Sequence, residues 1–165
     1  MKQNRSDHND YYDILLTPIG TLYLIFRSSV LIGISFEKPL AIIPKQTSGS
    51  AAAKKELSEY FDQGRRDFSF QTVFIEGTEF EQAVWEALKE IPYGETRTYK
   101  WIADKIGKPH ASRAVGNALG KNPLPIAFPC HRIIESDGSI GGYTPGVDIK
   151  RRLLEIEYYR RLSKT

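Results

Sequence analysis

Residues 98–119 have the sequence TYKWIADKIGKPHASRAVGNAL, which predicts two short helices joined by a turn. Thr98 is a good helix N-cap, and Gly107-Lys108-Pro109 interrupts the helical pattern. We therefore expect one helix over residues 99–106 and a second over residues 111–119. Two helices of this length around a glycine-containing turn are typical of a helix-turn-helix unit, although a plain helical hairpin has the same pattern.

The same part of the chain carries an excess of positive charge. Between positions 97 and 134, seven basic residues stand against a single acidic one, Asp104, so this block has a formal charge of +6, whereas the whole chain has +3. Lys and Arg side chains neutralise phosphates and add salt-sensitive affinity for nucleic acid. A basic surface alone more often binds nothing, but here it coincides with the predicted helix-turn-helix and favours DNA as a partner. The seven residues are Arg97, Lys100, Lys105, Lys108, Arg113, Lys121 and Arg132.

The first third of the chain predicts a sheet. Segments rich in Tyr, Leu, Ile and Phe alternate with short turn sequences, which indicates an antiparallel meander. Residues 38–50 are expected to form a loop, after which Ser50 caps a helix that ends at Gly64. The predicted strands are residues 11–16, 21–27, 30–36 and 68–75.

A second domain is expected to begin near Gly77. Thr78 and Glu81 form a predicted capping box at the start of an amphipathic helix. The expected domains are therefore residues 1–76, a scaffold, and residues 77–165. After the two-helix unit we expect a strand over residues 125–134, a glycine-rich loop over 137–146, which together would form a wing, and a last helix over 147–162.

Cys130 is the single cysteine of the chain and directly precedes His131 in the predicted strand. A lone cysteine in an apolar segment is most often a small buried hydrophobic residue. The neighbouring imidazole and Arg132 favour a nucleophile, because both lower a thiol pKa toward the thiolate. Adjacent strand residues point to opposite faces, so a bridging water would join the two side chains. A carboxylate must also orient the histidine, and periodicity does not choose between Glu155 and Glu157.

Several classes of function lack their sequence signals. One cysteine and three histidines have no metal-ligand spacing, and no phosphate-binding loop or dinucleotide fingerprint occurs, so we expect no metal and no soluble cofactor. No apolar run approaches the roughly 20 residues of a membrane span, and residues 1–10 lack an apolar signal core. A lone cysteine fits a reducing compartment. We expect a cytoplasmic protein with no membrane partner, and a monomer.

Residues 129–133, PCHRI, resemble the active-site signature of the O6-alkylguanine-DNA alkyltransferases, also called methylated-DNA–protein-cysteine methyltransferases. The likeness is colinear from about residue 78 to residue 157 and is weak in detail over residues 1–75. It implies an α+β protein with an N-terminal ribonuclease-H-like domain and a C-terminal winged helix-turn-helix-like domain. The other matching segments are IPYGET (91–96), Tyr99, SRAVGNA (112–118), NPLPI (122–126), Gly142-Tyr143 and Glu157.

The resemblance implies DNA repair by direct reversal, with O6-alkylguanine in double-stranded DNA as substrate and O4-alkylthymine as a further possibility. Cys130 would attack the alkyl carbon and keep it as a thioether, and each molecule would act once because no second thiol exists to restore it. His131 would take the thiol proton through a water, and Glu157 would orient His131. Asn122 would tie the helix-turn-helix to the active-site segment. Tyr99 would donate a proton toward the guanine ring.

The resemblance also implies that the damaged nucleotide rotates out of the duplex, because the O6 substituent lies inside it. Arg113 would fill the gap, and the second helix would enter the minor groove. Pro145-Gly146 replaces the consecutive glycines more usual in the family, which stiffens the loop over the base and puts tolerance of bulky adducts in question. The zinc ligands of some relatives are absent. Implied DNA-binding residues are Tyr99, Ala111, Ser112, Arg113, Ala114, Gly116, Asn117 and Lys121, and implied substrate-binding residues are Cys130, Ile133, Tyr143 and Thr144.

Three other functions share some of these features. Alkyltransferase-like proteins bind the same lesions without repairing them, but their reactive cysteine is replaced, commonly by tryptophan, and this chain keeps Cys130. A thiol hydrolase would use Cys130, His131 and a carboxylate, but would not need Tyr99, Arg113 or the basic block. A methyl-sensing transcriptional regulator would need a further segment and further cysteines. Direct reversal is therefore the favoured function, with non-catalytic lesion binding as the alternative.

Overall fold

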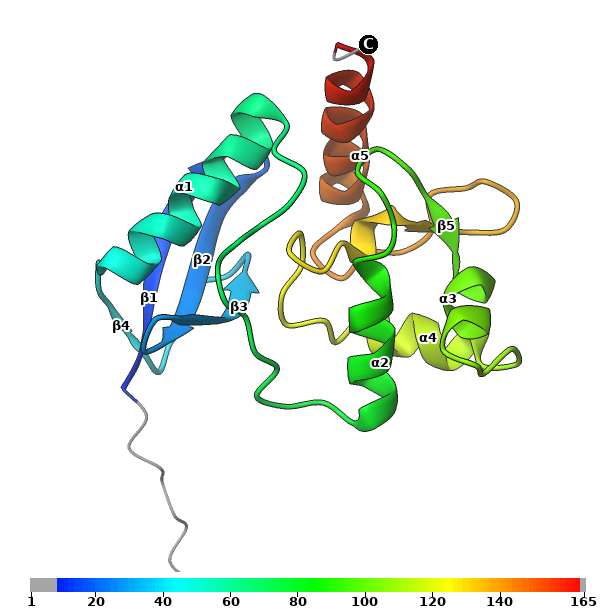
Figure 1. Ribbon diagram of the computed structural model, residues 1–165, viewed down its shortest axis with the longest axis horizontal. Helices are drawn as coiled ribbons and strands as arrows, with labels where there is room; N and C mark the ends of the chain where they lie inside the picture. The colour runs from blue at the N-terminus through cyan, green and yellow to red at the C-terminus, as the bar shows by residue number, and fades with distance from the viewer. Residues whose placement is uncertain (1–8, 164–165) are drawn as a thin grey trace, which may run out of the picture.

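The first described strands form the predicted meander. The computed structural model describes residues 9–163, so residues 1–8, where the sequence shows no apolar signal core, lie outside the described part. Strands β1 (Asp10–Thr17), β2 (Gly20–Arg27) and β3 (Val30–Ser35) pair antiparallel, and β4 (Ile43–Pro44), in the segment expected to be a loop, pairs parallel with β1. The strand order is β3-β2-β1-β4, and one face is covered by helix α1 (Ser48–Gln63; Figure 1).

The N-cap of α1 differs from the predicted one. Thr47, not Ser50, is the N-cap: Ser50 N donates to Thr47 Oγ1 at 3.0 Å, and Thr47 N donates to Ser50 Oγ at 2.8 Å. The two residues therefore form a reciprocal capping box, in which Ser50 is the third helical residue. Gly64 ends the helix as predicted, in the left-handed conformation that glycine adopts without strain.

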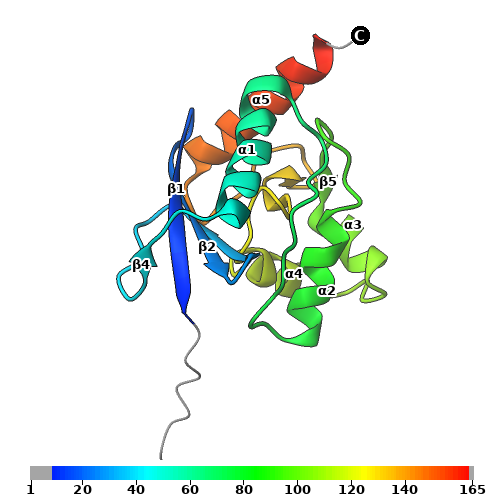
Figure 2. The same ribbon diagram turned by 60° about the vertical axis from the view of Figure 1, so that its left-hand side comes forward.

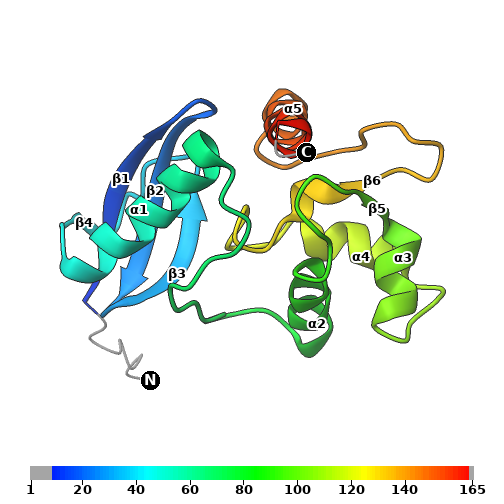
Figure 3. The ribbon, with the colours of Figure 1, turned by 45° about the horizontal axis from the view of Figure 1, so that its top comes forward.

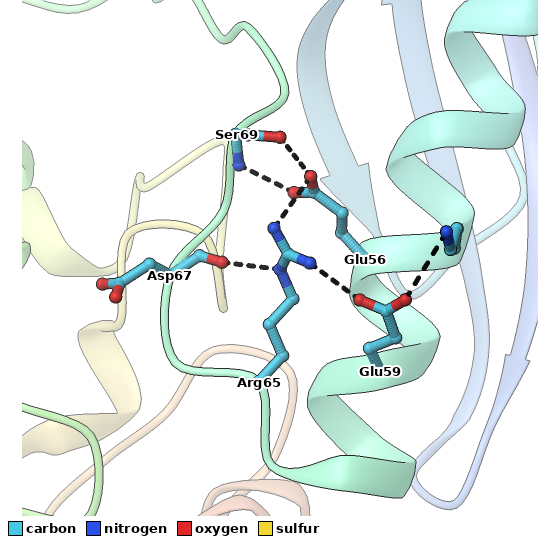
Figure 4. Close-up of polar contacts among 6 residues, drawn as sticks. Glu56, Glu59, Arg65, Asp67 and Ser69 are labelled. Carbon is cyan, nitrogen blue, oxygen red and sulfur yellow. Dashed lines mark hydrogen bonds and ion pairs between the residues drawn. The ribbon is translucent and has the colours of Figure 1, made fainter.

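The predicted strand over residues 68–75 is wrong. The segment makes one isolated bridge, between Leu31 and Thr72. Its start is instead held by side chains of α1: Ser69 N donates to Glu56 at 2.7 Å, and Arg65 pairs with Glu59 at 2.7 Å (Figure 4). An amide that donates to a carboxylate is not available to a neighbouring strand, so the segment crosses to the second half of the chain as a linker.

Helices dominate the second half. The capping box of Thr78 and Glu81 is confirmed, as is the N-cap Thr98, whose side chain accepts from Trp101 N at 3.1 Å. The two predicted helices joined by a turn are also confirmed, with Ala111 as the N-cap of the second. The elements are α2 (Glu79–Leu88), β5 (Arg97–Thr98), α3 (Tyr99–Lys105), α4 (Ser112–Leu119), β6 (Ile133–Ile134) and α5 (Val147–Leu162).

The predicted strand over residues 125–134 is also wrong. Only Ile133–Ile134 pair as a strand, parallel to β5, and Cys130–Arg132 form one turn of 3-10 helix. Proline at positions 125 and 129 removes two of the amides that a strand ladder over these residues would need. The remaining amides bond locally: Cys130 N donates to Phe128 O at 2.8 Å, and Arg132 N donates to Pro129 O at 3.1 Å.

Helix α5 lies between the sheet and the helices of the second half (Figures 1 and 3). Its C-terminal part runs close to α1, where Arg160 donates to Phe61 O at 3.2 Å (Figure 2). On the other side of the molecule, Ile34 N in β3 donates to Pro123 O at 2.9 Å. Both halves therefore position the segment around Cys130. No helix within residues 9–163 is long and apolar enough to cross a membrane.

Candidate active site

One face of α5 buries two charged side chains. Lys150, Leu153 and Glu157 are at most 1% exposed, and their spacing of three and four residues places them in one row along the helix. Glu157 Oε2 lies 2.5 Å from His131 Nε2, and Glu157 Oε1 accepts from Arg132 Nε at 2.7 Å. Glu155 points outward, with its side chain 48% exposed. The contacts therefore select Glu157, which periodicity could not do.

The electrostatics keep His131 neutral. Burial lowers the pKa of His131, and the nearby Glu157 only partly opposes this effect. The pKa of Glu157 is lowered to about 2, because His131 and Arg132 outweigh the burial that would raise it. A carboxylate only accepts hydrogen bonds, so Nε2 carries the proton of the neutral ring. Nδ1 is buried without a hydrogen-bond partner among the described residues, which leaves its lone pair free to act as a base.

Cys130 is held as a thiol. It is 7% exposed, and burial raises its pKa, although Asn122, Lys150 and Tyr143 act in the opposite direction. The sequence predicted a lowered pKa from the neighbouring His131 and Arg132, and this is wrong. His131 is neutral and the Arg132 charge is paired with Glu157, so neither supplies free positive charge to the thiol. Deprotonation of Cys130 therefore requires a base.

Asn122 fixes the backbone that leads to Cys130. Its Nδ2 donates to Phe128 O at 2.8 Å, and its Oδ1 accepts from Leu124 N at 3.0 Å. Both bonds close the turns that follow α4, and a hydrogen bond from Asn122 also lowers the pKa of the Cys130 thiol. Asn122 therefore joins the end of the two-helix unit to the reactive sulfur.

A cavity of about 220 Å³, here called the α4-side pocket, leads to Cys130. Tyr99 lies on one wall, and burial followed by the charge of Glu135 raises its pKa, so its hydroxyl stays protonated and can donate. Tyr143 lies on the loop over the pocket, and burial raises its pKa well above the ordinary value. The lining residues are Tyr99, Gly116, Leu119, Gly120, Cys130, Gly142, Tyr143 and Thr144.

Ile133, predicted to touch substrate, lines neither this pocket nor the other described cavities. Its side chain is fully buried, and its backbone pairs with Arg97. Among residues 9–163 no three His, Cys, Asp or Glu side chains are grouped to hold a metal ion.

Helix α4 presents a polar outer face beside the α4-side pocket. Val115 and Ala118 are buried, while Arg113, Ala114, Asn117 and nearby Lys121 are exposed. Ala111, Ser112 and Gly116 are half-buried, and a Cβ at Gly116 would lie 3.7 Å from the Tyr99 ring.

The basic block is smaller as a surface than its sequence charge indicated. Arg132 is buried against Glu157. Lys100 and Lys105 pair with Asp104 and Glu90 at 2.7 and 3.2 Å. Lys108, Arg113 and Lys121 form no ion pair within the described residues and stay exposed.

Comparison with known proteins shows the family of this chain. Residues 79–159 match the family model described as 6-O-methylguanine DNA methyltransferase, DNA binding domain. A methylated-DNA--protein-cysteine methyltransferase of Methanosarcina barkeri is 46% identical over 154 residues, which cover 89% of this chain and 96% of that protein. The chain belongs to the O6-methylguanine DNA methyltransferase family.

Solved structures of relatives show the same fold. The crystal structure of Mycobacterium tuberculosis OGT in complex with DNA has a TM-score of 0.84 at 41% identity, with 91% of this chain and 94% of that chain covered. The O6-methylguanine-DNA methyltransferase of Pyrococcus kodakaraensis has a TM-score of 0.66 at 26% identity, with 90% of this chain and 98% of that chain covered. The mixed α+β class expected for this family member is thereby confirmed.

Sequence reasoning missed Lys150. The residue is 1% exposed, its Nζ donates to Gly142 O at 3.1 Å, and it makes no ion pair with a described carboxylate. Burial lowers its pKa, and Cys130 and Glu135 oppose that shift. The signal was present as a lysine seven residues before Glu157, on the same helical face, but lysines on helices are usually solvated.

Proposed function

We propose that this family member repairs DNA by direct reversal, moving the methyl or larger alkyl group of O6-alkylguanine in double-stranded DNA irreversibly onto Cys130. It is a methylated-DNA–protein-cysteine methyltransferase that acts once per molecule. The observation that carries the proposal is a buried thiol under a pocket, next to a neutral histidine whose Nδ1 is free and whose Nε2 is held by Glu157 at 2.5 Å. The same transfer to Cys130 would also act on O4-alkylthymine.

The chemical step balances with groups of this chain. His131 Nδ1 takes the Cys130 proton through a water, and the thiolate attacks the alkyl carbon in line with the C–O6 bond. The S–C bond forms as the C–O6 bond breaks, and the electron pair leaves with the guanine. Tyr99 donates toward the guanine ring, and one proton taken up by the base balances the one lost by the thiol. A thioether has no proton to lose and no second thiol to restore it, so turnover ends.

Two residues assist without reacting. Asn122 holds the turn that carries Cys130 through its bonds to Phe128 and Leu124. Lys150 supplies a buried positive charge that the thiolate neutralises as it forms. Charges act strongly in a buried site, so this effect lowers the cost of deprotonation.

DNA would approach the face formed by α3 and α4. The base must leave the stack to reach Cys130, because a protein thiol cannot reach O6 inside the duplex. Arg113 is exposed on α4 and suited to enter the gap, and Lys108 and Lys121 are suited to phosphates. The remaining proposed DNA contacts are Ala111, Ser112, Ala114, Gly116 and Asn117, and Tyr143 and Thr144 would close over the base.

The same proposal covers the architecture around this site. Residues 1–76 form a ribonuclease-H-like scaffold domain, and residues 77–165 form a winged helix-turn-helix-like domain that binds DNA and carries the site. The protein acts as a cytoplasmic monomer without a membrane partner. The matched family model, which begins at residue 79, supports a second domain that begins at residue 77.

The test is intact-mass analysis after mixing the protein with duplex DNA that carries one O6-methylguanine. We expect one methyl gain, mapped to Cys130, that saturates at one per chain and is abolished by Cys130→Ala. An unchanged mass with tight lesion binding would support the alternative, a non-catalytic lesion-binding protein. Repair that continues linearly beyond one equivalent would refute the single-turnover step.

A further inference from the structure

A second cavity reaches Cys130 from the side of the sheet. It has a volume of about 780 Å³ and is here called the sheet-side cleft. Five residues line both it and the α4-side pocket, so the reactive sulfur stands where the two cavities meet. The shared residues are Leu119, Gly120, Cys130, Tyr143 and Thr144.

The two cavities differ in size and in the elements that form them. At about 220 Å³ the α4-side pocket is smaller than the roughly 300–1,000 Å³ typical of small-molecule sites, so it has room for a base and little else. The sheet-side cleft falls within that range. Much of its remaining wall comes from β2, β3, the linker before α2 and the start of α5, and includes Ile25, Ile32, Phe36, Ile75 and Ile149. These walls are mostly apolar.

The geometry of the reaction directs a long substituent sideways. In-line displacement places O6, the alkyl carbon and the Cys130 sulfur nearly on one line, with the base in the α4-side pocket. The rest of the alkyl chain must therefore leave this line at a steep angle. The sheet-side cleft is the larger space that Cys130 also lines, so a chain that leaves the line has apolar surface to enter.

The charge of the cleft is one-sided. Its charged lining residues are Asp10, Glu37 and Glu76, and no Lys or Arg of the described chain lines it. Asp10 is paired with Arg27 at 2.9 Å, whereas Glu37 and Glu76 are exposed and form no ion pair with a described residue. The cleft thus offers apolar walls and a negative rim, the opposite of the surface that meets phosphate.

We propose that the sheet-side cleft holds the distal part of O6 substituents longer than methyl, and that Glu37 and Glu76 make it favour neutral and cationic substituents over anionic ones. The inference rests on the proposed function and names the substrates of the same site. It also implies that the rigid Pro145, which lines the cleft, does not exclude long chains, because the free space lies on the sheet side of that loop.

The first experiment compares single-turnover rates on matched duplexes that carry O6-methyl-, O6-hexyl-, O6-(6-aminohexyl)- or O6-(5-carboxypentyl)guanine. We expect the aminohexyl group to transfer about five-fold faster than the carboxypentyl group at low salt, with the ratio shrinking as salt rises, because the attraction between exposed charges is weak and is screened by salt. Glu37→Gln with Glu76→Gln should abolish the ratio. The control, Glu86→Gln with Asp62→Asn, removes two exposed carboxylates outside every described cavity and should preserve it.

A second experiment fills the cleft. Ile75 lines it and Val73 does not, yet both side chains lie in the same linker and both are 46% exposed. We expect Ile75→Trp to slow hexyl transfer at least about three-fold while methyl transfer stays within two-fold, as about 0.6 kcal/mol of lost apolar contact implies. Val73→Trp should change neither rate. Equal thermal midpoints would show that both variants are folded.

The outcomes separate this inference from the proposed function. Absence of methyl transfer refutes the proposed function. When methyl transfer is normal, three results would refute the cleft assignment and leave the proposed function intact. These are undetectable hexyl transfer, equal rates for the two charged chains, and unchanged hexyl transfer in Ile75→Trp. A charge preference that survives Glu37→Gln with Glu76→Gln would likewise refute the role of the rim.

Discussion

Replacing Glu157 with glutamine tests the buried charge cluster most directly, because the side chain keeps its shape and loses its charge. The pKa of Glu157 is lowered from 4.5 to about 2 in the folded protein. At about 1.4 kcal/mol per pKa unit, this shift corresponds to a contribution of about 3–4 kcal/mol to the free energy of unfolding at neutral pH. Breaking a buried pair and leaving Arg132 without its carboxylate costs a similar amount, about 3–5 kcal/mol. We therefore expect Glu157→Gln to cost about 3 kcal/mol.

The sign of the pH dependence follows from the same shift. A carboxyl whose folded pKa is lowered stabilises the fold fully above its unfolded pKa, and this contribution is lost as pH falls from 4.5 toward about 2. The difference in unfolding free energy between wild type and Glu157→Gln should therefore be greatest near neutral pH and shrink below pH 4.5. The lowered pKa of His131 also destabilises the wild type as pH falls below 6.5, because the unfolded state then binds more protons.

Urea denaturation near neutral pH and again near pH 3 measures both expectations. Glu155→Gln is the matched control, since Glu155 lies two residues away and its side chain is 48% exposed. It should stay within about 0.5 kcal/mol of wild type at each pH. Two results would contradict the stabilising role of the Glu157 charge. One is a loss of less than about 1 kcal/mol in the free energy of unfolding of Glu157→Gln near neutral pH, and the other is an equal loss near pH 3.

Three further expectations concern the reaction. Lys150→Met should slow methyl transfer about ten- to a hundredfold without loss of stability, because removal of a nearby positive charge raises the thiol pKa. Lys150→Arg and the exposed control Arg151→Gln should change the transfer rate little. A wild-type rate in Lys150→Met would rule out the role of Lys150. Tyr99→Phe should slow transfer about a hundredfold, as loss of a general acid does, while the DNA affinity in a gel-shift assay stays unchanged. If the transfer rate and the DNA affinity fell by the same factor, the hydroxyl would only bind DNA. The transfer rate should hold as pH falls through the ordinary histidine range, because burial lowers the pKa of His131, and a drop centred at 6.5 would contradict a buried neutral base.

Elements with local signals were predicted well from sequence. The last helix, Val147–Leu162, and the capping box at Thr78 have the predicted positions, and the three-strand meander differs only at its ends. The two helices around Gly107 are also confirmed. In each case a cap, a turn residue or an apolar period lies within a few positions of the element that it specifies.

Errors arose where side-chain hydrogen bonds or prolines take away backbone groups that a strand would use. Residues 68–75 have strand-like composition, but Glu56 of α1 accepts the Ser69 amide and the segment stays a linker. Residues 125–134 are apolar, but their prolines and the bonds from Asn122 favour consecutive turns. An apolar run cannot be told from a buried irregular segment by periodicity alone.

The candidate site also has features that the local sequence specifies and features that depend on distant residues. The sequence by itself determined the identity of Cys130 and His131 and, through resemblance, the family, because these residues are adjacent and their motif is specific. Only the tertiary structure decided that the thiol is protonated, that Arg132 is paired with Glu157, and that the buried charge of Lys150 lowers the pKa of the thiol without an ion pair of its own. A pKa depends on burial and on charges brought together from 20 to 26 residues away, and local sequence carries no record of that environment.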